Sequence, residues 1–177
     1  RSNTPYTEQC SREAVRIIFQ SLVHVYEHGD DLDARADLQR AAYLAGVAFT
    51  RAYVGYVHAV AHTLGGFYQV PHGLANAVIL PYVLEDYGAT VHRRLAELAD
   101  VAGIGGSGGL AEKSEAFIQA IRTMNRQMGI PEKIAGIRDE DIPLMIRRAL
   151  EEGNPLYPVP KIFTQRDMET VYQRIRG

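Results

Sequence analysis

The sequence lacks several features that would place it in a specialised class of protein. Its 177 residues contain no tryptophan and a single cysteine, Cys10, so no disulfide can form within the chain. One cysteine suits a reducing cytoplasm, where we expect the protein to act. No apolar run approaches the roughly 20 residues that a membrane-spanning helix requires. We therefore expect no membrane partner.

A strong charge and a targeting signal are also missing. The formal net charge at pH 7 is -2, which gives no electrostatic reason to expect a nucleic acid or an anionic membrane as partner. The first ten residues, RSNTPYTEQC, contain neither an initiator methionine nor the apolar core of a signal peptide. We expect that the chain does not begin where its gene begins.

The spacing of apolar residues predicts an all-α fold, a helical bundle. Thr4 and Pro5 supply an N-cap and a proline at the first helical position, and apolar residues then recur every three or four positions until Gly29. Further helices are expected over residues 73–86, 88–102, 111–128, 139–151 and 164–175. No segment alternates as a strand would, so we expect residues 1–177 to form a single all-helical domain.

Residues 33 to about 64 form a longer helical stretch that is rich in alanine and glycine. Because small side chains allow helices to approach closely, we expect this stretch at the centre of the bundle. Gly65–Gly66 and Pro71 should interrupt the helix. The last helix should begin with a capping box formed by Thr164 and Asp167.

Two short motifs match enzyme patterns without the context that those patterns require. HVYEH, from His24 to His28, fits the H-x-x-E-H zinc-protease pattern, but it ends an amphipathic helix, where the helix dipole favours histidines. GIGGSG, from Gly103 to Gly108, fits the dinucleotide-binding pattern, yet a helical segment precedes it where a strand is required. We interpret the first as a helix end and the second as a loop between helices.

Three further histidines form a pattern with more chemical content. His58 and His62 are four residues apart, so they share one face of a helix, and the breaks before His72 let it return to that face. Neutral imidazoles bind iron, zinc and similar divalent metals. A helical histidine pair is, however, often only hydrogen-bonded or partly exposed. Nothing acidic lies between Asp37 and Glu85, so no carboxylate stands within the cluster.

The same segment carries a family resemblance. The run G-x-x-H-A-x-A-H-x-L-G-x-x-Y-x-x-P-H-G-x-A-N-A-x-x-L-P, from Gly55 to Pro81, resembles the signature of the iron-containing (group III) alcohol dehydrogenases. MGIPEKIAGI and NPLYPVPKIFTQRDMETVY resemble the closing segments of that family. The resemblance covers the whole chain. It implies the C-terminal helical metal-binding domain of the dehydroquinate synthase-like fold, with the N-terminal NAD(P)-binding domain absent from this chain.

The resemblance also implies roles for particular residues. The metal of the family is held by one aspartate and three histidines, and the first two ligands lie in a D-x-x-x-H motif that should precede Arg1. His58 and His72 match the other two metal ligands. His62 matches a histidine near the nicotinamide that assists proton movement, which makes it the catalytic and cofactor-binding candidate. Phe49 matches an aromatic residue that walls the substrate pocket.

The expected function follows from these roles. Fe2+ or Zn2+ would polarise a small primary alcohol or aldehyde, and hydride would pass between it and NAD or NADP. The isolated chain should bind metal weakly and oxidise no alcohol. Family members are often dimers or larger, so we expect a homodimer or a larger assembly. Zinc glycerol dehydrogenases, maleylacetate reductases and a non-enzymatic helical module, with structural or pH-sensing histidines, remain as alternatives.

Overall fold

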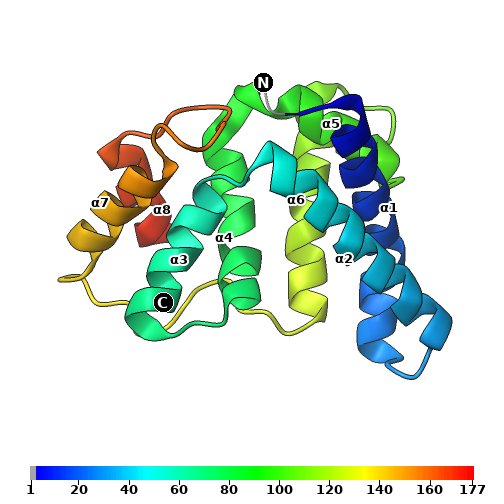
Figure 1. Ribbon diagram of the computed structural model, residues 1–177, viewed down its shortest axis with the longest axis horizontal. Helices are drawn as coiled ribbons and strands as arrows, with labels where there is room; N and C mark the ends of the chain where they lie inside the picture. Colours follow the sequence, from blue (N-terminus) through cyan, green and yellow to red (C-terminus); the bar gives the residue numbers. More distant parts are fainter. Residues whose placement is uncertain (1–2) are drawn as a thin grey trace. The chain divides into compact units, whose positions relative to one another are not determined.

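The computed structural model describes residues 3–177, and the regular structure in that range is helical (Figure 1). Its elements are α1 (Pro5–Glu27), α2 (Leu32–Ala52), α3 (Tyr56–Tyr68), α4 (His72–Tyr87), the short 3-10 helix η1 (Gly88–Thr90), α5 (His92–Val101), α6 (Leu110–Gln127), α7 (Ile142–Gly153) and α8 (Gln165–Ile175). Apart from an isolated bridge between Ile134 and Arg176, the described residues contain no β-structure. The all-α prediction is confirmed. None of these helices is both long and apolar enough to cross a membrane.

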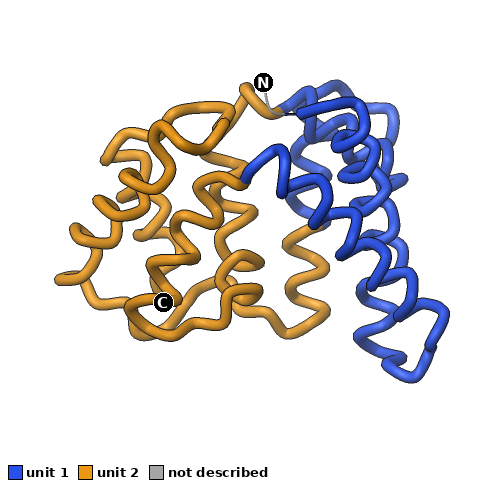
Figure 2. The backbone as a smooth tube through the Cα atoms, in the orientation of Figure 1, with its two compact units in different colours: residues 1–53, 92–120 blue, residues 54–91, 121–177 orange. Residues whose placement is uncertain are grey.

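The chain divides into two compact units, which Figure 2 shows in different colours. The first unit contains the residues up to Tyr53 together with His92–Ala120, and the second contains Val54–Val91 and Ile121–Gly177. The division therefore falls inside α6. That residues 1–177 form a single domain stays a prediction.

In the first unit α1 and α2 pack against each other along their length. Thr4 caps α1 as predicted, because its side chain accepts a hydrogen bond from the backbone N–H of Thr7 and Pro5 occupies the first turn. The interface between the two helices buries small residues such as Ala14 and Ala41. Further along α1, the ring of Phe19 stacks on that of Phe117 from α6.

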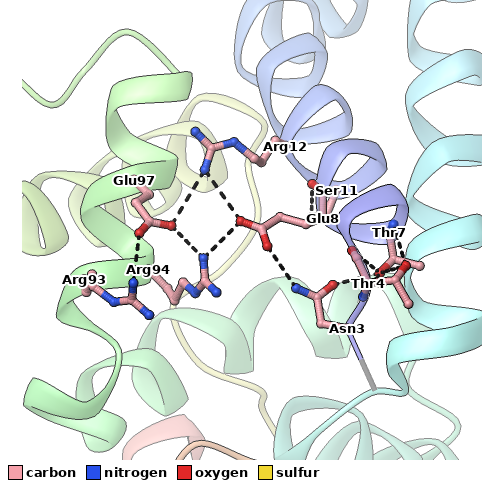
Figure 3. Close-up of polar contacts among 9 residues, drawn as sticks. All are labelled: Asn3, Thr4, Thr7, Glu8, Ser11, Arg12, Arg93, Arg94 and Glu97. Carbon is pink, nitrogen blue, oxygen red and sulfur yellow. Dashed lines mark hydrogen bonds and ion pairs between the residues drawn. The ribbon is translucent and has the colours of Figure 1, made fainter. Parts of the chain in front are cut away.

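A network of charged side chains joins α1 to α5 in the same unit (Figure 3). Arg94 donates to Glu8 at 3.0 Å and to Glu97 at 2.8 Å, and Arg12 lies between the same two carboxylates. These side chains are about one third exposed or more. Because water screens such pairs, each contributes only about 0–1 kcal/mol, and the network mainly fixes which faces of the two helices meet.

The structure corrects the prediction for residues 33–64. The chain does not continue as one helix there, because α2 ends at Ala52 and α3 begins at Tyr56. Tyr53 has a left-handed φ of 64°, which breaks the helical hydrogen bonding. The small residues of α2 are not central either: Ala42 is exposed, while Ala41 and Ala48 are buried. Because α2 packs mainly on one neighbour, α1, it buries only a single stripe of side chains along its surface.

The most buried helix is α3 in the second unit, which packs between α4 and α7 (Figure 1). It has fully buried side chains at five positions, Tyr56, Ala59, Val60, Ala61 and Leu64. Helix α8 packs on both α4 and α7 and completes this unit. The second unit therefore has its core around the helix that carries two of the candidate histidines.

The prediction that Gly65–Gly66 would interrupt this helix was wrong. Helix α3 runs through both glycines to Tyr68 and ends at Gln69, which has a left-handed φ of 55°. Tertiary contacts stabilise the last turn, since the hydroxyl of Tyr68 donates to Asp141 at 2.6 Å. Two glycines cost about 1 kcal/mol each relative to alanine in a helix, which such contacts can offset.

The remaining helices follow their predicted ranges closely. Helix α4 passes through the buried Pro81. Helix α5 follows η1 and begins four residues later than expected, at His92, and α7 begins three residues later, at Ile142. The capping box of α8 is present as predicted, with Thr164 and Asp167 bonding each other's backbone N–H groups.

Candidate functional site

Three histidine side chains of the second unit lie together. His58 and His62 are one turn apart on α3, and His72 is the first residue of α4. The centroids of their rings are separated by 6.0 Å for His58–His62, 5.2 Å for His58–His72 and 5.3 Å for His62–His72. This arrangement confirms that His72 returns to the face of the helical pair. The roles assigned to the three residues stay predictions.

The spacing of His58 and His72 fits a shared metal ion. A tetrahedral ion bound by two imidazole nitrogens at about 2.1 Å would hold the two ring centroids about 5.2 Å apart. The observed separation is 5.2 Å. Among residues 3–177 no group of three or more His, Cys, Asp or Glu side chains could hold a metal ion. The described residues thus bring the rings of His58 and His72 to a separation that is compatible with one shared ion.

The surroundings of His58 favour its neutral form. Burial lowers the pKa of the imidazole, and the neighbouring rings of His72 and His62 lower it further. The carboxylate of Glu152 acts in the opposite direction and raises this pKa. A neutral imidazole has a nitrogen lone pair, which a metal ligand needs. Near neutral pH this side chain is therefore in the state required for coordination.

Sequence analysis missed a carboxylate that belongs to this cluster. Glu152, in the last turn of α7, places Oε1 2.7 Å from Nδ1 of His62. The hydroxyl of Tyr157 donates to the same oxygen at 2.6 Å, and burial together with that carboxylate raises the pKa of Tyr157 to about 12. Glu152 lies 90 residues from His62 along the chain. No local sequence pattern links them, so only the packing of α7 on α3 could reveal the contact.

The contact between α3 and α7 is fixed by Tyr56. Its hydroxyl donates to Oδ1 of Asn154 at 2.6 Å and accepts from the backbone N–H of Phe163 at 3.0 Å. Its ring is fully buried and stacks on the ring of Phe163, with centroids 4.6 Å apart. The first turn of α3 is thereby tied to the segment that follows α7, which sets the distance between Glu152 and His62.

His72 has a partner on its own helix. Nδ2 of Asn76, four residues later, lies 2.9 Å from Nε2 of His72. The other amide atom of Asn76, Oδ1, is buried and has no hydrogen-bond partner among the described residues. Asn76 belongs to the same Pro-His-Gly-x-Ala-Asn run as His72, and it orients the ring at the start of α4.

Phe49 is in a different part of the structure from the histidines. It lies on α2, in the first unit, and its side chain is 51% exposed. Together with Ala45, Ala48 and Tyr53 it lines an open, mostly apolar groove of about 350 Å3 between α1 and α2. An exposed aromatic ring in an apolar groove suits a pocket wall, and this role of Phe49 stays a prediction.

The two motifs set aside earlier lie where they were expected. His24 and His28 end α1 and begin the turn after it, with ring centroids 4.9 Å apart, and Nε2 of His24 lies 2.9 Å from a carboxylate oxygen of Asp31. The run Gly103–Gly108 forms the loop between α5 and α6. Its interpretation as an inter-helix loop is confirmed.

Comparison with known proteins decides the family. The model of the C-terminal part of the Fe-containing alcohol dehydrogenase family matches residues 1–176. This chain belongs to that family.

Individual relatives agree with this assignment. Alcohol dehydrogenase 4 of Saccharomyces cerevisiae is 37% identical over 98% of the chain, and 1,3-propanediol dehydrogenase of Klebsiella pneumoniae is 34% identical over 96% of it. The solved structure of an alcohol dehydrogenase from Oenococcus oeni matches 98% of the chain with a TM-score of 0.91 and 35% identity. The chain spans 45%, 44% and 46% of these three proteins, respectively. The predicted family and its C-terminal helical fold are confirmed.

Proposed function

We propose that this chain supplies the metal-binding side chains of an NAD(P)-dependent alcohol dehydrogenase that interconverts small primary alcohols and aldehydes. The convergence of His58, His62 and His72 from two helices is the observation that carries the proposal. Membership of the family and the names of relatives, an alcohol dehydrogenase and a propanediol dehydrogenase, support the substrate class.

Within this proposal His58 and His72 hold the metal. Their ring separation suits a shared ion, and the low pKa of His58 keeps its lone pair available. When bound, a divalent metal supplies Lewis-acid polarisation of an alcohol oxygen, and a nicotinamide supplies the hydride acceptor. We expect Fe2+ or Zn2+ as the ion, because both accept imidazole ligands, and either NAD or NADP as the cofactor.

His62 moves the proton in this scheme. With Nδ1 facing Glu152, its Nε2 is the nitrogen that receives the proton released from the alcohol. The side chain is 46% exposed, so the proton can pass on to water. Phe49 is proposed to wall the substrate pocket. We further propose that residues 1–177 act as one domain in a cytoplasmic homodimer or larger assembly.

The test is metal binding by the 177-residue chain. The chain is purified anaerobically, titrated with Fe2+ and Zn2+ by calorimetry and analysed for bound metal by mass spectrometry. We expect weak binding by the parent chain and at least about tenfold weaker binding by His58→Ala and by His72→Ala, since each removes one of two ligands. His24→Ala and His28→Ala remove a histidine pair of the same spacing and should leave the affinity unchanged.

A negative result in the parent chain is also decisive when it is followed by one further measurement. If the isolated chain binds neither ion, the same two substitutions are made in a polypeptide that contains this chain and a nucleotide-binding domain. Loss of metal in both variants supports the proposal. Retention of stoichiometric metal by both His58→Ala and His72→Ala would overturn it.

A further inference from the structure

We infer that Glu152 is a positioning residue that holds His62 in one tautomer, with the proton on Nδ1 and the lone pair on Nε2. Its consequence for catalysis rests on the proposed function, whereas the tautomer is a property of the chain itself. The inference starts from a hydrogen bond between two helices that are distant in sequence, α3 and α7.

The chemistry of the contact determines which nitrogen carries hydrogen. Oε1 of Glu152 lies 2.7 Å from Nδ1 of His62, a distance typical of a charge-assisted hydrogen bond. An ionised carboxylate can only accept, so Nδ1 of the imidazole must donate. A neutral imidazole has a single N–H group, and Nε2 is then the acceptor.

Contacts other than the one with His62 also hold Glu152 in place. The hydroxyl of Tyr157 donates to the same carboxylate oxygen at 2.6 Å, and the side chain of Glu152 is only 30% exposed. Its neighbour Gly153 packs directly against the buried ring of Tyr56, which keeps the last turn of α7 on α3. Because the hydrogen bond from Tyr157 and the packing of α7 already position this carboxylate, it loses little conformational entropy when it orients the imidazole.

The other nitrogen of His62 faces a different environment. The hydrogen bonds of residues 3–177 include no partner for Nε2 of His62. The ring stacks on that of His72 with an interplanar angle of 16° and centroids 5.3 Å apart. Glu152 therefore leaves the lone pair of His62 on Nε2 free to accept a proton.

The chain contains an internal reference for this arrangement. His24 contacts the carboxylate of Asp31 through Nε2 and not through Nδ1. The same reasoning assigns it the opposite tautomer, with the proton on Nε2. The two histidines thus differ in a property that one nuclear magnetic resonance spectrum can report.

The experiment measures the tautomers directly. The 177-residue chain is labelled with 15N-histidine, and long-range proton–nitrogen correlations are recorded without metal at an alkaline pH, where the imidazoles are neutral. We expect Nδ1–H for His62 and Nε2–H for His24. Glu152→Ala should switch His62 to Nε2–H, the form that free neutral imidazole favours. Glu152→Gln should keep Nδ1–H, because its amide oxygen still accepts a hydrogen bond.

The controls separate positioning from unfolding and from the proposed function. Unchanged His24 signals in Glu152→Ala show that the first unit is intact, and unchanged methyl signals of the buried Ile79 and Ile175 do the same for the second. Nε2–H on His62 in the parent chain, or no change in Glu152→Ala, would overturn the inference whatever the activity.

A second readout uses a polypeptide with the nucleotide-binding domain. We expect Glu152→Ala to lower kcat about 10- to 100-fold with little change in KM, and Glu152→Gln to restore part of the loss. A tautomer switch without any effect on kcat would leave the positioning role intact and remove His62 from the proposed mechanism. A loss of turnover without a tautomer switch would contradict the inference.

Discussion

Gly153 is the residue at which the packing of α7 on α3 is tightest. A Cβ atom built at this position would lie 2.6 Å and 2.9 Å from two ring carbons of Tyr56. That ring is fully buried, and its hydroxyl donates to Asn154 and accepts from the backbone N–H of Phe163, so it cannot move aside. The absence of a side chain at position 153 thereby brings the neighbouring Glu152 within reach of His62.

Gly153→Ala is expected to destabilise the chain by about 1–3 kcal/mol, because it overpacks a closed interface. The change is measured as the difference in the free energy of unfolding from urea denaturation. Gly66→Ala provides the matched control, since its Cβ would meet no atom within 4 Å and should stabilise helix α3 by about 0.5–1 kcal/mol. Equal effects of the two substitutions would contradict the packing argument.

The candidate site was partly readable from residues alone. His58, His62 and His72 stand out because the helical spacing of the first two and the proline before the third are local signals. Glu152 could not be found in that way, since it is one of two adjacent glutamates, Glu151 and Glu152, on an amphipathic helix. The packing of α7 decides which of the two faces His62 and which is exposed.

At the scale of elements, helix starts were predicted well because N-caps use side chains within three residues of each other. Thr4 and Thr164 both cap their helices as expected. Helix interiors and ends were predicted less well. The helix is interrupted at Tyr53, between α2 and α3, although this residue is neither glycine nor proline. Gly65 and Gly66, by contrast, remain helical. Tertiary contacts override weak local preferences of about 1 kcal/mol.

The cap of α8 gives the fold a defined dependence on acid. Hydrogen bonds from Thr164 and the ammonium group of Lys161 lower the pKa of Asp167 from its ordinary value of 3.8 to about 2. Because the folded chain holds the ionised form more strongly than the unfolded chain, the stabilisation is complete above about pH 4 and is lost as the pH falls towards 2.

Asp167→Asn should therefore lower the melting temperature near about pH 5 and have a much smaller effect near about pH 2, where about half of the parent carboxyl groups are already protonated. Thermal unfolding followed by circular dichroism at both pH values provides the measurement. Glu169→Gln, on the exposed face of the same helix, removes the same charge without removing a cap. A similar pH profile for the two variants would show that the cap is not the cause.

At the scale of the whole molecule, the chain matches only part of each longer relative. It spans less than half the length of relatives such as 1,3-propanediol dehydrogenase. The described residues contain no set of three metal-binding side chains, and the glycine-rich run Gly103–Gly108 follows helix α5, where a dinucleotide site requires a strand.

We accordingly expect the purified 177-residue chain to oxidise neither 1,3-propanediol nor methanol with NAD or NADP in the presence of Fe2+ or Zn2+. The formation of reduced nicotinamide is followed by absorbance, with the complete 1,3-propanediol dehydrogenase of Klebsiella pneumoniae as the positive control. Sustained turnover by a chain of verified mass would show that the residues described here are sufficient for catalysis.

By itself the sequence determined the helical class, most helix starts and the three histidines of the signature, because periodicity, capping and i,i+4 spacing act over a few residues. Only the tertiary structure decided that α3, and not α2, is the buried helix, and that Glu152 reaches His62 from 90 residues away. Burial and long-range hydrogen bonds depend on which faces of the helices meet. That choice follows from the complementarity of many side chains together, such as Gly153 against Tyr56, and no short segment contains it.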